Sequence, residues 1–354
     1  MDEGLIRAAL ERAWQGRAAQ FEAAPGAGRA ANGGLGGAWR GAIRLFNGFV
    51  EGGFDLSAEL YAETLVLINH ADPPEALRPA LRAAQAFYLE RLPWLRCVVV
   101  KERHAPRHPP GDALRRGCIT YGDTPADRVS ENGVWYALDL RLHQDTSFYL
   151  DTRHLREWAR QNLAGQRVLN TFAYTGSLGV AALAGGAAQV IQLDRDRQFL
   201  ALARRSYELN GLPFRAADFY AGDFFSGVSQ LKRASAGSPA ARFDCVFLDP
   251  PFFSVTARGR VDLLNESARL INKVRPLLRD GGWLAAINNA LFLSGAEYLK
   301  TLERLCADGY LSLEALIPVP QDCFGYAQAR PLPADPAPFN HATKIALLRV
   351  KRKA

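Results

Sequence analysis

Short apolar segments alternate with segments of helical periodicity in the second half of the chain, and this alternation most constrains the fold. The apolar segments are residues 167–170, 189–194, 243–249 and 282–287. Strands of this kind, separated by helices, are typical of a parallel sheet covered by helices on both faces. A helix near 294–307 and strands at 311–319 and 343–350 follow. We therefore expect an α/β domain over residues 146–354.

The first part of the chain predicts a smaller and different domain. Residues 5–24 repeat apolar side chains at helical spacing, and six glycines lie between Pro25 and Gly37, so we expect residues 1–37 to form a helix and a linker. An α+β domain should occupy residues 38–145. Its expected elements are strands at 42–46 and 63–68 around the turn 51–53, a helix at 75–91, a strand at 95–101, and a strand pair at 118–120 and 135–138 around the turn 131–133.

Composition narrows the class of protein. The chain has 354 residues, of which 48% are hydrophobic and 22% charged, and this excludes a disordered or fibrous protein. The sequence shows neither a basic leader nor an apolar run of about 18 residues, so we expect a cytoplasmic protein without a membrane partner. A net charge of +7 favours a polyanionic partner such as RNA. Five widely spaced cysteines predict reduced thiols and no metal site.

The ends of the first three strands in the α/β domain, the third of them presumed before Asp223, carry residues suited to binding an adenosine-containing cofactor. The first strand runs into a loop in which Gly176 allows a ligand to approach the backbone closely, although a simple strand-to-helix turn is the alternative. The second strand ends at Asp194, whose carboxylate could accept hydrogen bonds from both ribose hydroxyls. The alternative for Asp194 is a helix cap before Arg195. Asp223 could accept from the adenine amino group while Phe224 packs on the ring, or it could be a cap.

The strand at 243–249 ends in the sharpest motif, Asp249-Pro250-Pro251-Phe252-Phe253. The prolines stop the strand and stiffen the loop, so the Asp249 carboxylate and the Pro250 carbonyl become fixed acceptors beside aromatic rings. Acceptors along one edge and a ring on one face suit a flat nitrogen base. A rigid turn without a catalytic role is the alternative.

In three segments the chain resembles the bacterial class I methyltransferases of 23S rRNA, a family with cytosine-C5 and guanine-N7 branches. The segments are residues 146–153, 169–176 and 249–253, and the likeness extends over residues 40–350. The resemblance implies a Rossmann-like domain with a seven-stranded, mostly parallel sheet, S-adenosylmethionine as the cofactor, and ribosomal RNA as the partner. The oligomeric state stays open.

The resemblance also implies roles for individual residues. Those expected to bind the cofactor are Phe148, Asp151 and Arg153, which close over it, Asn170, Phe172, Tyr174, Thr175 and Gly176 at its methionine end, Asp194, Arg195, Asp223 and Phe224 at ribose and adenine, and Asp249. Those expected to face the base are Asp249, Pro250, Phe252, Phe253, Asn288 and Asn289. Ser147 stands where the family usually has glycine, and Thr152 where it has glutamine.

Two departures from the family pattern matter more. The family usually begins with a PUA-type RNA-binding domain, which residues 1–37 do not resemble, so RNA capture should fall to the middle domain. The loop Lys101–Arg116, with five basic and two acidic residues, is a candidate, and a solvated surface loop is its alternative.

The second departure concerns the chemistry. A C5 enzyme needs a cysteine thiolate, because carbon 5 of cytosine does not attack a sulfonium directly. In the C5 branch that cysteine follows the strand that corresponds to 282–287, where this chain has Asn288 and Asn289, as in the guanine-N7 branch. Cys323 is the remaining candidate nucleophile, whereas Cys245 is expected in the core.

The sequence therefore predicts methylation of a nitrogen of an RNA base by direct displacement. Three alternatives stay open: methylation of DNA adenine, a protein or a small molecule; a catalytically silent RNA-binding module; and C5 chemistry through Cys323. The sequence does not identify the nucleotide or atom, or whether free RNA or a ribosomal particle is recognised.

Overall fold

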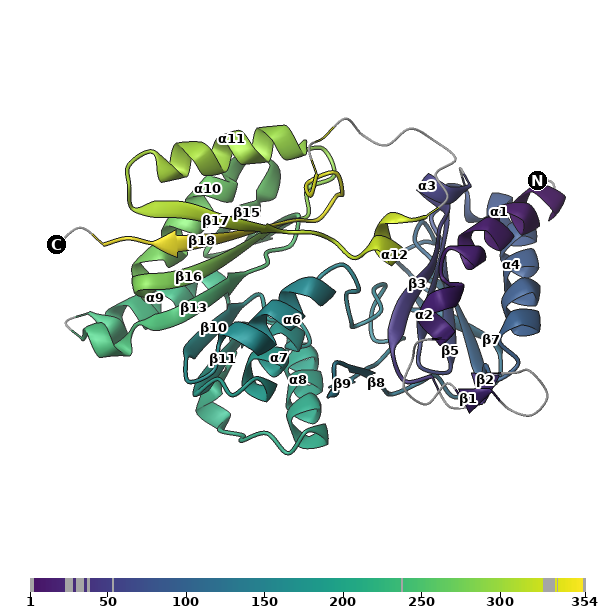
Figure 1. Cartoon of the computed structure of the whole chain (residues 1–354), viewed down its shortest axis with the longest axis horizontal. Coiled ribbons are helices and arrows are strands. Elements are labelled where there is room, and N and C mark those ends of the chain that lie inside the picture. The colour runs from purple at the N-terminus through teal and green to yellow at the C-terminus, as the bar shows by residue number, and fades with distance from the viewer. Residues whose placement is uncertain are drawn as a thin grey trace. The chain divides into compact units, whose positions relative to one another are not determined.

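The computed structural model describes residues 3–22, 28–29, 35–36, 39–52, 54–236, 238–326, 335 and 337–352 (Figure 1). The chain divides into two compact units. The first contains Met1–Leu150 and Pro320–Leu332, and the second contains Asp151–Val319 and Pro333–Ala354. In the described part of the chain, no helix combines the length and the apolar character needed to cross a membrane.

The first unit is built on a five-stranded sheet. Its strands, in spatial order, are β3 (Ala42–Asn47), β4 (Leu56–Tyr61), β5 (Thr64–Asn69), β6 (Cys97–Glu102) and β7 (Cys118–Tyr121). Only β5 and β6 are parallel, and helix α4 (Arg78–Arg91) connects them. Helix α1 (Glu3–Gln15) packs against α4, and its apolar side chains are part of the core of this unit. The N-terminal helix therefore belongs to the first unit rather than to a separate segment.

Two details of the first unit differ from the sequence-based prediction. Strand β4 was not predicted, and it lies between the two strands that were predicted on either side of the turn 51–53. The segment 118–121 pairs with β6, whereas the hairpin around Asn132 and Gly133 is formed by β8 (Arg128–Glu131) and β9 (Val134–Ala137). The Gly-rich linker lies largely outside the described residues. The remaining elements here are α2 (Ala18–Glu22), β1 (Gly28–Arg29), β2 (Leu35–Gly36), α3 (Gly48–Glu51) and α5 (Gly111–Arg116).

Helix α12 (Gln321–Phe324) returns from the C-terminal part of the chain to the first unit. Fully buried Arg17 donates to Glu51 at 2.8 Å and to the carbonyl of Asp322 at 2.9 Å. The amide of Asn47 donates to the carbonyl of Cys323 at 3.0 Å. Residues 320–332 were expected in the methyltransferase domain, and these buried polar contacts hold the described part of that segment in the first unit instead.

The second unit contains a seven-stranded sheet, and the expected fold class is confirmed. Its strands are β12 (Phe219–Ala221), β11 (Gln189–Asp194), β10 (Arg167–Thr171), β13 (Phe243–Leu248), β16 (Leu278–Asn288), β18 (Lys344–Val350) and β17 (Leu311–Ile317), in spatial order. The first five are parallel, and β18 is antiparallel to β16 and β17. This is a Rossmann-like sheet with an antiparallel edge.

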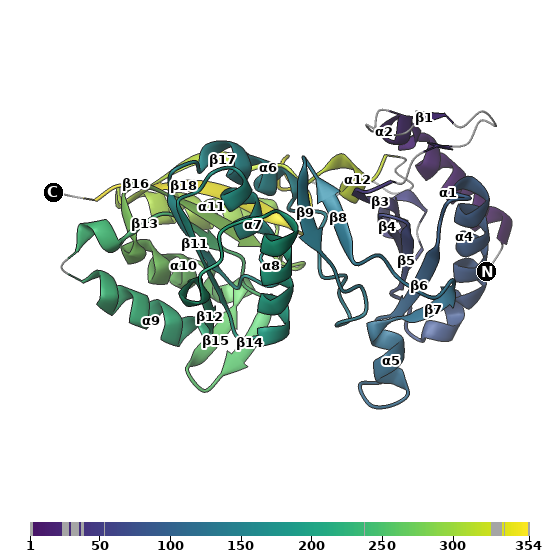
Figure 2. The ribbon, with the colours of Figure 1, turned by 90° about the horizontal axis from the view of Figure 1, so that it is seen from below.

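Helices cover both faces of this sheet (Figures 1 and 2). On one face lie α6 (Arg153–Asn162), α7 (Ser177–Ala184) and α8 (Arg197–Leu209), and on the other lie α9 (Phe224–Ser235), α10 (Leu263–Val274) and α11 (Gly295–Cys306). A hairpin of β14 (Phe253–Thr256) and β15 (Gly259–Asp262) lies between β13 and α10 in the chain. The apolar faces of α9, α10 and α11 pack with the strands into one core.

Candidate functional site

The carboxyl ends of the parallel strands bring most of the predicted site residues to one edge of the second unit. Strand β10 lies between β11 and β13, and Thr171 at its end pairs in register with Leu193 and with Leu248. The loops that follow these three strands therefore leave the sheet side by side. The chain order of the strands reverses at this point, which is where open α/β sheets bind ligands.

The loop after β10 has an unusual backbone. Phe172, Tyr174 and Gly176 have φ angles of 52°, 51° and 76°, in the left-handed region that L side chains rarely adopt. Gly176 precedes the first residue of α7, and a Cβ there would lie 2.6 Å from the Cβ of Ala203. Glycine is therefore required at position 176 for both its conformation and its packing.

Asp194, at the end of β11, holds this loop in place. One carboxylate oxygen accepts from the backbone N–H of Tyr174 at 2.8 Å, and the other accepts from Asp196 at 2.9 Å. Burial raises the pKa of Asp194 above its usual value, while these two hydrogen bonds lower it. Each oxygen keeps a second acceptor position, so the carboxylate can still receive ribose hydroxyl groups.

Asn170 lies beneath the loop rather than on its ligand-facing side. Its amide is buried and donates to Gln192 at 2.8 Å, and Gln192 in turn donates to the carbonyl of Gly176 at 3.3 Å. The predicted contact of Asn170 with the cofactor stays a prediction, and the structure shows that its side-chain amide is hydrogen-bonded inside the fold. Asn170 positions the Gly176 turn through Gln192.

The other predicted cofactor residues differ in how they are placed. Asp223 caps α9 by accepting from the backbone N–H groups of Phe225 and Ser226 at 2.9 and 3.2 Å, both on one oxygen. Phe224 is only 5% exposed, and its ring stacks on Phe172 at 4.4 Å. Arg195 is exposed. Asp223 is therefore a helix cap, as the alternative interpretation expected. Contact of Asp223, Phe224 and Arg195 with adenosine stays a prediction.

Tyr174 and Thr175 complete the loop after β10. The ring of Tyr174 is partly exposed and lies edge-on to Phe199 at 4.3 Å, whereas Thr175 is buried. Contact of these two residues with the methionine end of the cofactor stays a prediction.

Asp249 occupies the first position after β13, in the most unusual electrostatic surroundings of the site. The side chain is partly exposed, yet burial of the carboxyl, together with the smaller effect of the nearby carboxylate of Asp151, raises its pKa to about 7. Asp151 is held by the hydroxyl of Thr343, which donates to it at 2.5 Å. Near neutral pH, Asp249 can therefore hold or release a proton, as a group in a reaction site often must.

Exposed aromatic and apolar side chains surround Asp249 along the chain. Pro250 is buried, whereas Phe252 and Phe253 are 41% and 54% exposed. The ring of Phe252 lies 6.5 Å from that of Phe292, which follows β16 and is 79% exposed. Phe292 was missed by the sequence analysis, although the adjacent apolar pair Leu291-Phe292 in a loop was a usable signal. These rings are open to a planar partner.

The two asparagines after β16 behave differently from each other. Asn288 is fully buried, accepts from the backbone N–H of Ala290 at 2.9 Å and donates to the carbonyl of Leu263 at 3.3 Å. Its predicted contact with the base stays a prediction, and the structure shows that both ends of its amide are hydrogen-bonded to the backbone. The side-chain oxygen of Asn289 is buried and has no hydrogen-bond partner among the described residues, so Asn289 stays a candidate.

The predicted lid residues fall into different units. Phe148 belongs to the first unit, where it is 1% exposed and packs on Tyr136 at 5.0 Å. Its expected closure over the cofactor stays a prediction, and its ring is buried in this structure. Asp151 and Arg153 belong to the second unit, where Arg153 begins α6. Ser147 has a φ of 58°, in the left-handed region that favours glycine.

All five cysteines are unpaired. Cys323 is fully buried in the first unit, and Cys245 is buried within β13, as expected for a core residue. Cys306 ends α11, and burial raises the pKa of its thiol. The structure therefore gives Cys323 no exposed thiol with which to attack a base, and this weakens the C5 alternative.

Comparison with known proteins agrees with this architecture. The family described as S-adenosylmethionine-dependent methyltransferase matches residues 106–309, and the chain belongs to this family. S-adenosylmethionine is accordingly its cofactor. The resemblance found in the sequence motifs is thereby confirmed at the level of the family.

Curated relatives are named ribosomal RNA large subunit methyltransferase I. The protein from Aeromonas salmonicida is 38% identical over 212 residues, which cover 58% of this chain and 50% of that one. The protein from Serratia proteamaculans is 36% identical over 240 residues, which cover 65% and 58%. The matched part spans only about half of the length of these relatives.

Two solved structures share the fold. A SAM-dependent methyltransferase from Streptococcus mutans has a TM-score of 0.78 at 19% identity, covering 99% of this chain and 82% of that one. A second, from Agrobacterium tumefaciens, has a TM-score of 0.58 at 16% identity, covering 90% and 92%.

Proposed function

We propose that this chain transfers a methyl group from S-adenosylmethionine to a nitrogen of a base in ribosomal RNA. The proposal rests on Asp249, which stands at the carboxyl end of β13 beside the strand that carries the Gly176 loop. The names of the curated relatives support ribosomal RNA as the substrate, and this substrate implies a site of action in the cytoplasm.

The chain's residues fit the cofactor. The loop after β10 has three residues at positive φ, so it turns sharply at the start of α7 and presents backbone groups at the sheet edge. Asp194 and Asp223 offer carboxylate oxygens at the ends of the next two strands, which suits ribose hydroxyls and an adenine amine. When bound there, S-adenosylmethionine supplies an electrophilic methyl group on a sulfonium.

The Asp249 loop suits the acceptor base. Asp249 can accept a hydrogen bond from an N–H on the edge of the base, and the Pro250 carbonyl is a second acceptor held by the two prolines. Phe252 and Phe292 expose aromatic rings on which a base can stack. Fixing the nitrogen in line with the methyl group lowers the barrier by several kcal/mol, because the orientation is already established on binding.

The raised pKa of Asp249 gives the carboxyl a second use. An exocyclic amine that gains a methyl group also loses a proton, and a carboxylate whose pKa is about 7 can accept that proton near neutral pH. A ring nitrogen with a free lone pair needs no proton acceptor, and Asp249 then only orients the base. Nitrogen chemistry also fits the buried state of Cys323, because C5 chemistry requires an accessible thiolate.

The test compares Asp249→Ala with Glu303→Ala, which removes an exposed carboxylate from α11. We expect Asp249→Ala to lower methyl transfer to ribosomal RNA by more than about 100-fold while calorimetry still detects cofactor binding. Glu303→Ala should leave both unchanged. Normal methylation of RNA by Asp249→Ala would reject the proposed role of Asp249.

A further inference from the structure

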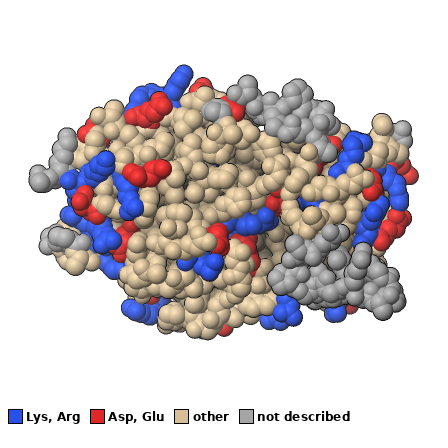
Figure 3. Space-filling view, in the orientation of Figure 1, with Lys and Arg blue, Asp and Glu red and all other residues tan. Residues whose placement is uncertain are grey.

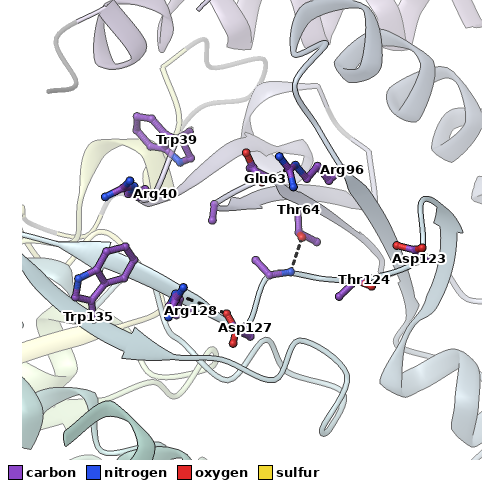
Figure 4. A pocket seen from close by; sticks show the side chains of 12 residues that line it. Trp39, Arg40, Glu63, Thr64, Arg96, Asp123, Thr124, Asp127, Arg128 and Trp135 are labelled. Atoms are coloured by element: carbon purple, nitrogen blue, oxygen red, sulfur yellow. Dashed lines mark hydrogen bonds and ion pairs between the residues drawn. The ribbon is translucent and has the colours of Figure 1, made fainter. Parts of the chain in front are cut away.

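A cavity of about 570 Å³ lies entirely within the first unit, and the reaction described above does not use it (Figure 4). Its lining comes from the segment before β3, the β4–β5 turn, the start of β6, the loop after β7 and the β8–β9 hairpin. A space of this size matches those that bind small ligands or single nucleotides.

Two indole rings form the aromatic part of the cavity. Trp39 packs on Phe21 at a centroid distance of 4.8 Å, and its ring N–H is buried without an acceptor among the described residues. Trp135 projects from β9 and is partly exposed. A ligand with a flat ring could stack on these indole rings.

Two arginines lie beside Trp135. The guanidinium carbons of Arg40 and Arg128 lie 5.7 and 5.6 Å from the centre of the ring, and Figure 4 shows Arg40 between the two tryptophans. The side chain of Arg40 makes no hydrogen bond or ion pair with a described residue. The nearest carboxylate oxygen to Arg128 is that of Asp127, at 3.8 Å, which is longer than a good hydrogen bond. These guanidinium groups can therefore still bind an anion.

The rest of the cavity limits how much anionic ligand can enter. Arg96 is already paired with Glu63 at 2.9 Å, and Asp123 and Asp127 add two further acids to the lining. Positive charge is thus confined to the end formed by Arg40 and Arg128. Basic and acidic side chains are also mixed over the face shown in Figure 3, so the net charge of +7 does not form one continuous basic surface there. A long phosphate backbone would meet the acids, whereas one nucleotide would not.

We propose that this cavity binds one unpaired nucleotide of the substrate RNA, with its base stacked on Trp135 and its phosphate beside Arg40 and Arg128. The inference rests on the proposed function, since it gives the first unit a part in holding the RNA that the second unit methylates. Aromatic rings combined with arginines are the usual means by which proteins hold single-stranded nucleic acid without reading its sequence.

The first experiment measures binding of uridine monophosphate to the full chain by calorimetry, in the presence of saturating S-adenosylhomocysteine to fill the cofactor site. Uridine and inorganic phosphate are measured separately. Because the cavity offers both a stacking surface and an anion site, the nucleotide should bind roughly tenfold tighter than either fragment. Equally tight binding of phosphate alone would overturn the inference. Tighter binding of a glutamate peptide than of the nucleotide would also overturn it, because the cavity would then prefer an acidic peptide.

Variants locate the binding within the cavity. Trp135→Leu and Arg40→Ala should each weaken binding of the nucleotide by about tenfold, whereas Trp135→Phe should keep most of it because the ring is retained. Arg12→Ala, which removes an exposed charge from α1, is the matched control and should have no effect. Circular dichroism checks that each variant is folded. Unchanged binding in both Trp135→Leu and Arg40→Ala would refute the assignment.

Kinetics with ribosomal RNA separate this inference from the proposed function. The cavity variants should raise KM for RNA and leave kcat at saturating RNA unchanged, since they alter capture and not the methyl-transfer step. Asp249→Ala should show the opposite pattern and bind the nucleotide normally. Methyl transfer with an unchanged KM in Trp135→Leu would reject the cavity alone, whereas nucleotide binding without any methyl transfer by the wild-type chain would reject the proposed function alone.

Discussion

The backbone N–H of Tyr174 donates a hydrogen bond to the carboxylate of Asp194 at 2.8 Å, and this bond ties the loop after β10 to the end of β11. One side chain thus shapes the loop and also offers acceptor positions to a ribose. If Asp194 binds the ribose as proposed, ligand binding and loop geometry are coupled through this residue, and removing its carboxylate should disturb both.

We expect Asp194→Ala to weaken S-adenosylmethionine binding by at least about tenfold, since hydrogen bonds to a charged group are among the stronger ones. The free energy of unfolding should fall by about 1–2 kcal/mol, because the N–H of Tyr174 loses its partner. Calorimetry and denaturant unfolding measure the two effects. Asp196→Ala is the control: it removes the cap of α8 and should lower stability without weakening cofactor binding. Equal loss of affinity in both variants would contradict a specific role for Asp194.

Gly176→Ala tests the loop itself. Alanine at a φ of 76°, with its Cβ 2.6 Å from Ala203, should lower the free energy of unfolding by about 2–3 kcal/mol and weaken cofactor binding. Gly165→Ala measures the loss of stability that comes from the backbone conformation alone, because Gly165 has a φ of 72° and a Cβ there would have no atom within 4 Å. That control should cost about 1 kcal/mol and leave the affinity unchanged. Identical effects in the two variants would show that packing at Gly176 is unimportant.

Asp249 should make stability depend on pH in a defined direction. Its pKa in the folded chain is about 7, above the unfolded value of 3.8, so the folded state binds more protons between these values and loses stability as pH rises through them. Asp249→Asn removes the ionisable group and with it this loss of stability at higher pH. Without ligands, it should raise the free energy of unfolding by about 1–3 kcal/mol near pH 8 and have little effect near pH 4. A stability difference that does not change with pH would show that the pKa of Asp249 is ordinary.

Cys323→Ala tests the remaining thiol chemistry. Because Cys323 is fully buried, we expect normal methyl transfer and a loss of stability of about 1 kcal/mol or less. Denaturing electrophoresis of the wild-type chain with RNA should show no covalent adduct. A trapped adduct that disappears in Cys323→Ala, together with loss of activity, would restore C5 chemistry.

The sequence was sufficient for the architecture of the second unit because its strands are short, apolar and bounded by turns, and each ends in a recognisable polar residue. The sequence analysis missed β4, although Leu56, Ala58 and Leu60 alternate with polar residues there. Glu59 in that strand is buried, and its carboxylate accepts from Tyr61 and Arg44. The alternation could have identified the strand, but the neighbouring glycines indicated a turn instead.

Residue types at strand ends identified the candidate site but not the direction in which each side chain points. Asn288 accepts from its own loop, and Asn170 donates to Gln192 on the adjacent strand, so both stabilise the site from within. The hydrogen-bond partner of each side chain depends on distances that only the folded chain defines. The same is true of Arg17, whose contact with Asp322 joins residues 305 positions apart.

Mass spectrometry of nucleosides tests the central claim most directly. Ribosomal RNA from a strain that lacks the gene would be incubated with the purified chain and S-adenosylmethionine carrying a deuterated methyl group, then digested to nucleosides. We predict one labelled nucleoside, methylated on a base nitrogen, that is absent when Asp249→Ala replaces the wild-type chain. Label on carbon 5 of cytosine, or no label in the RNA, would contradict the account.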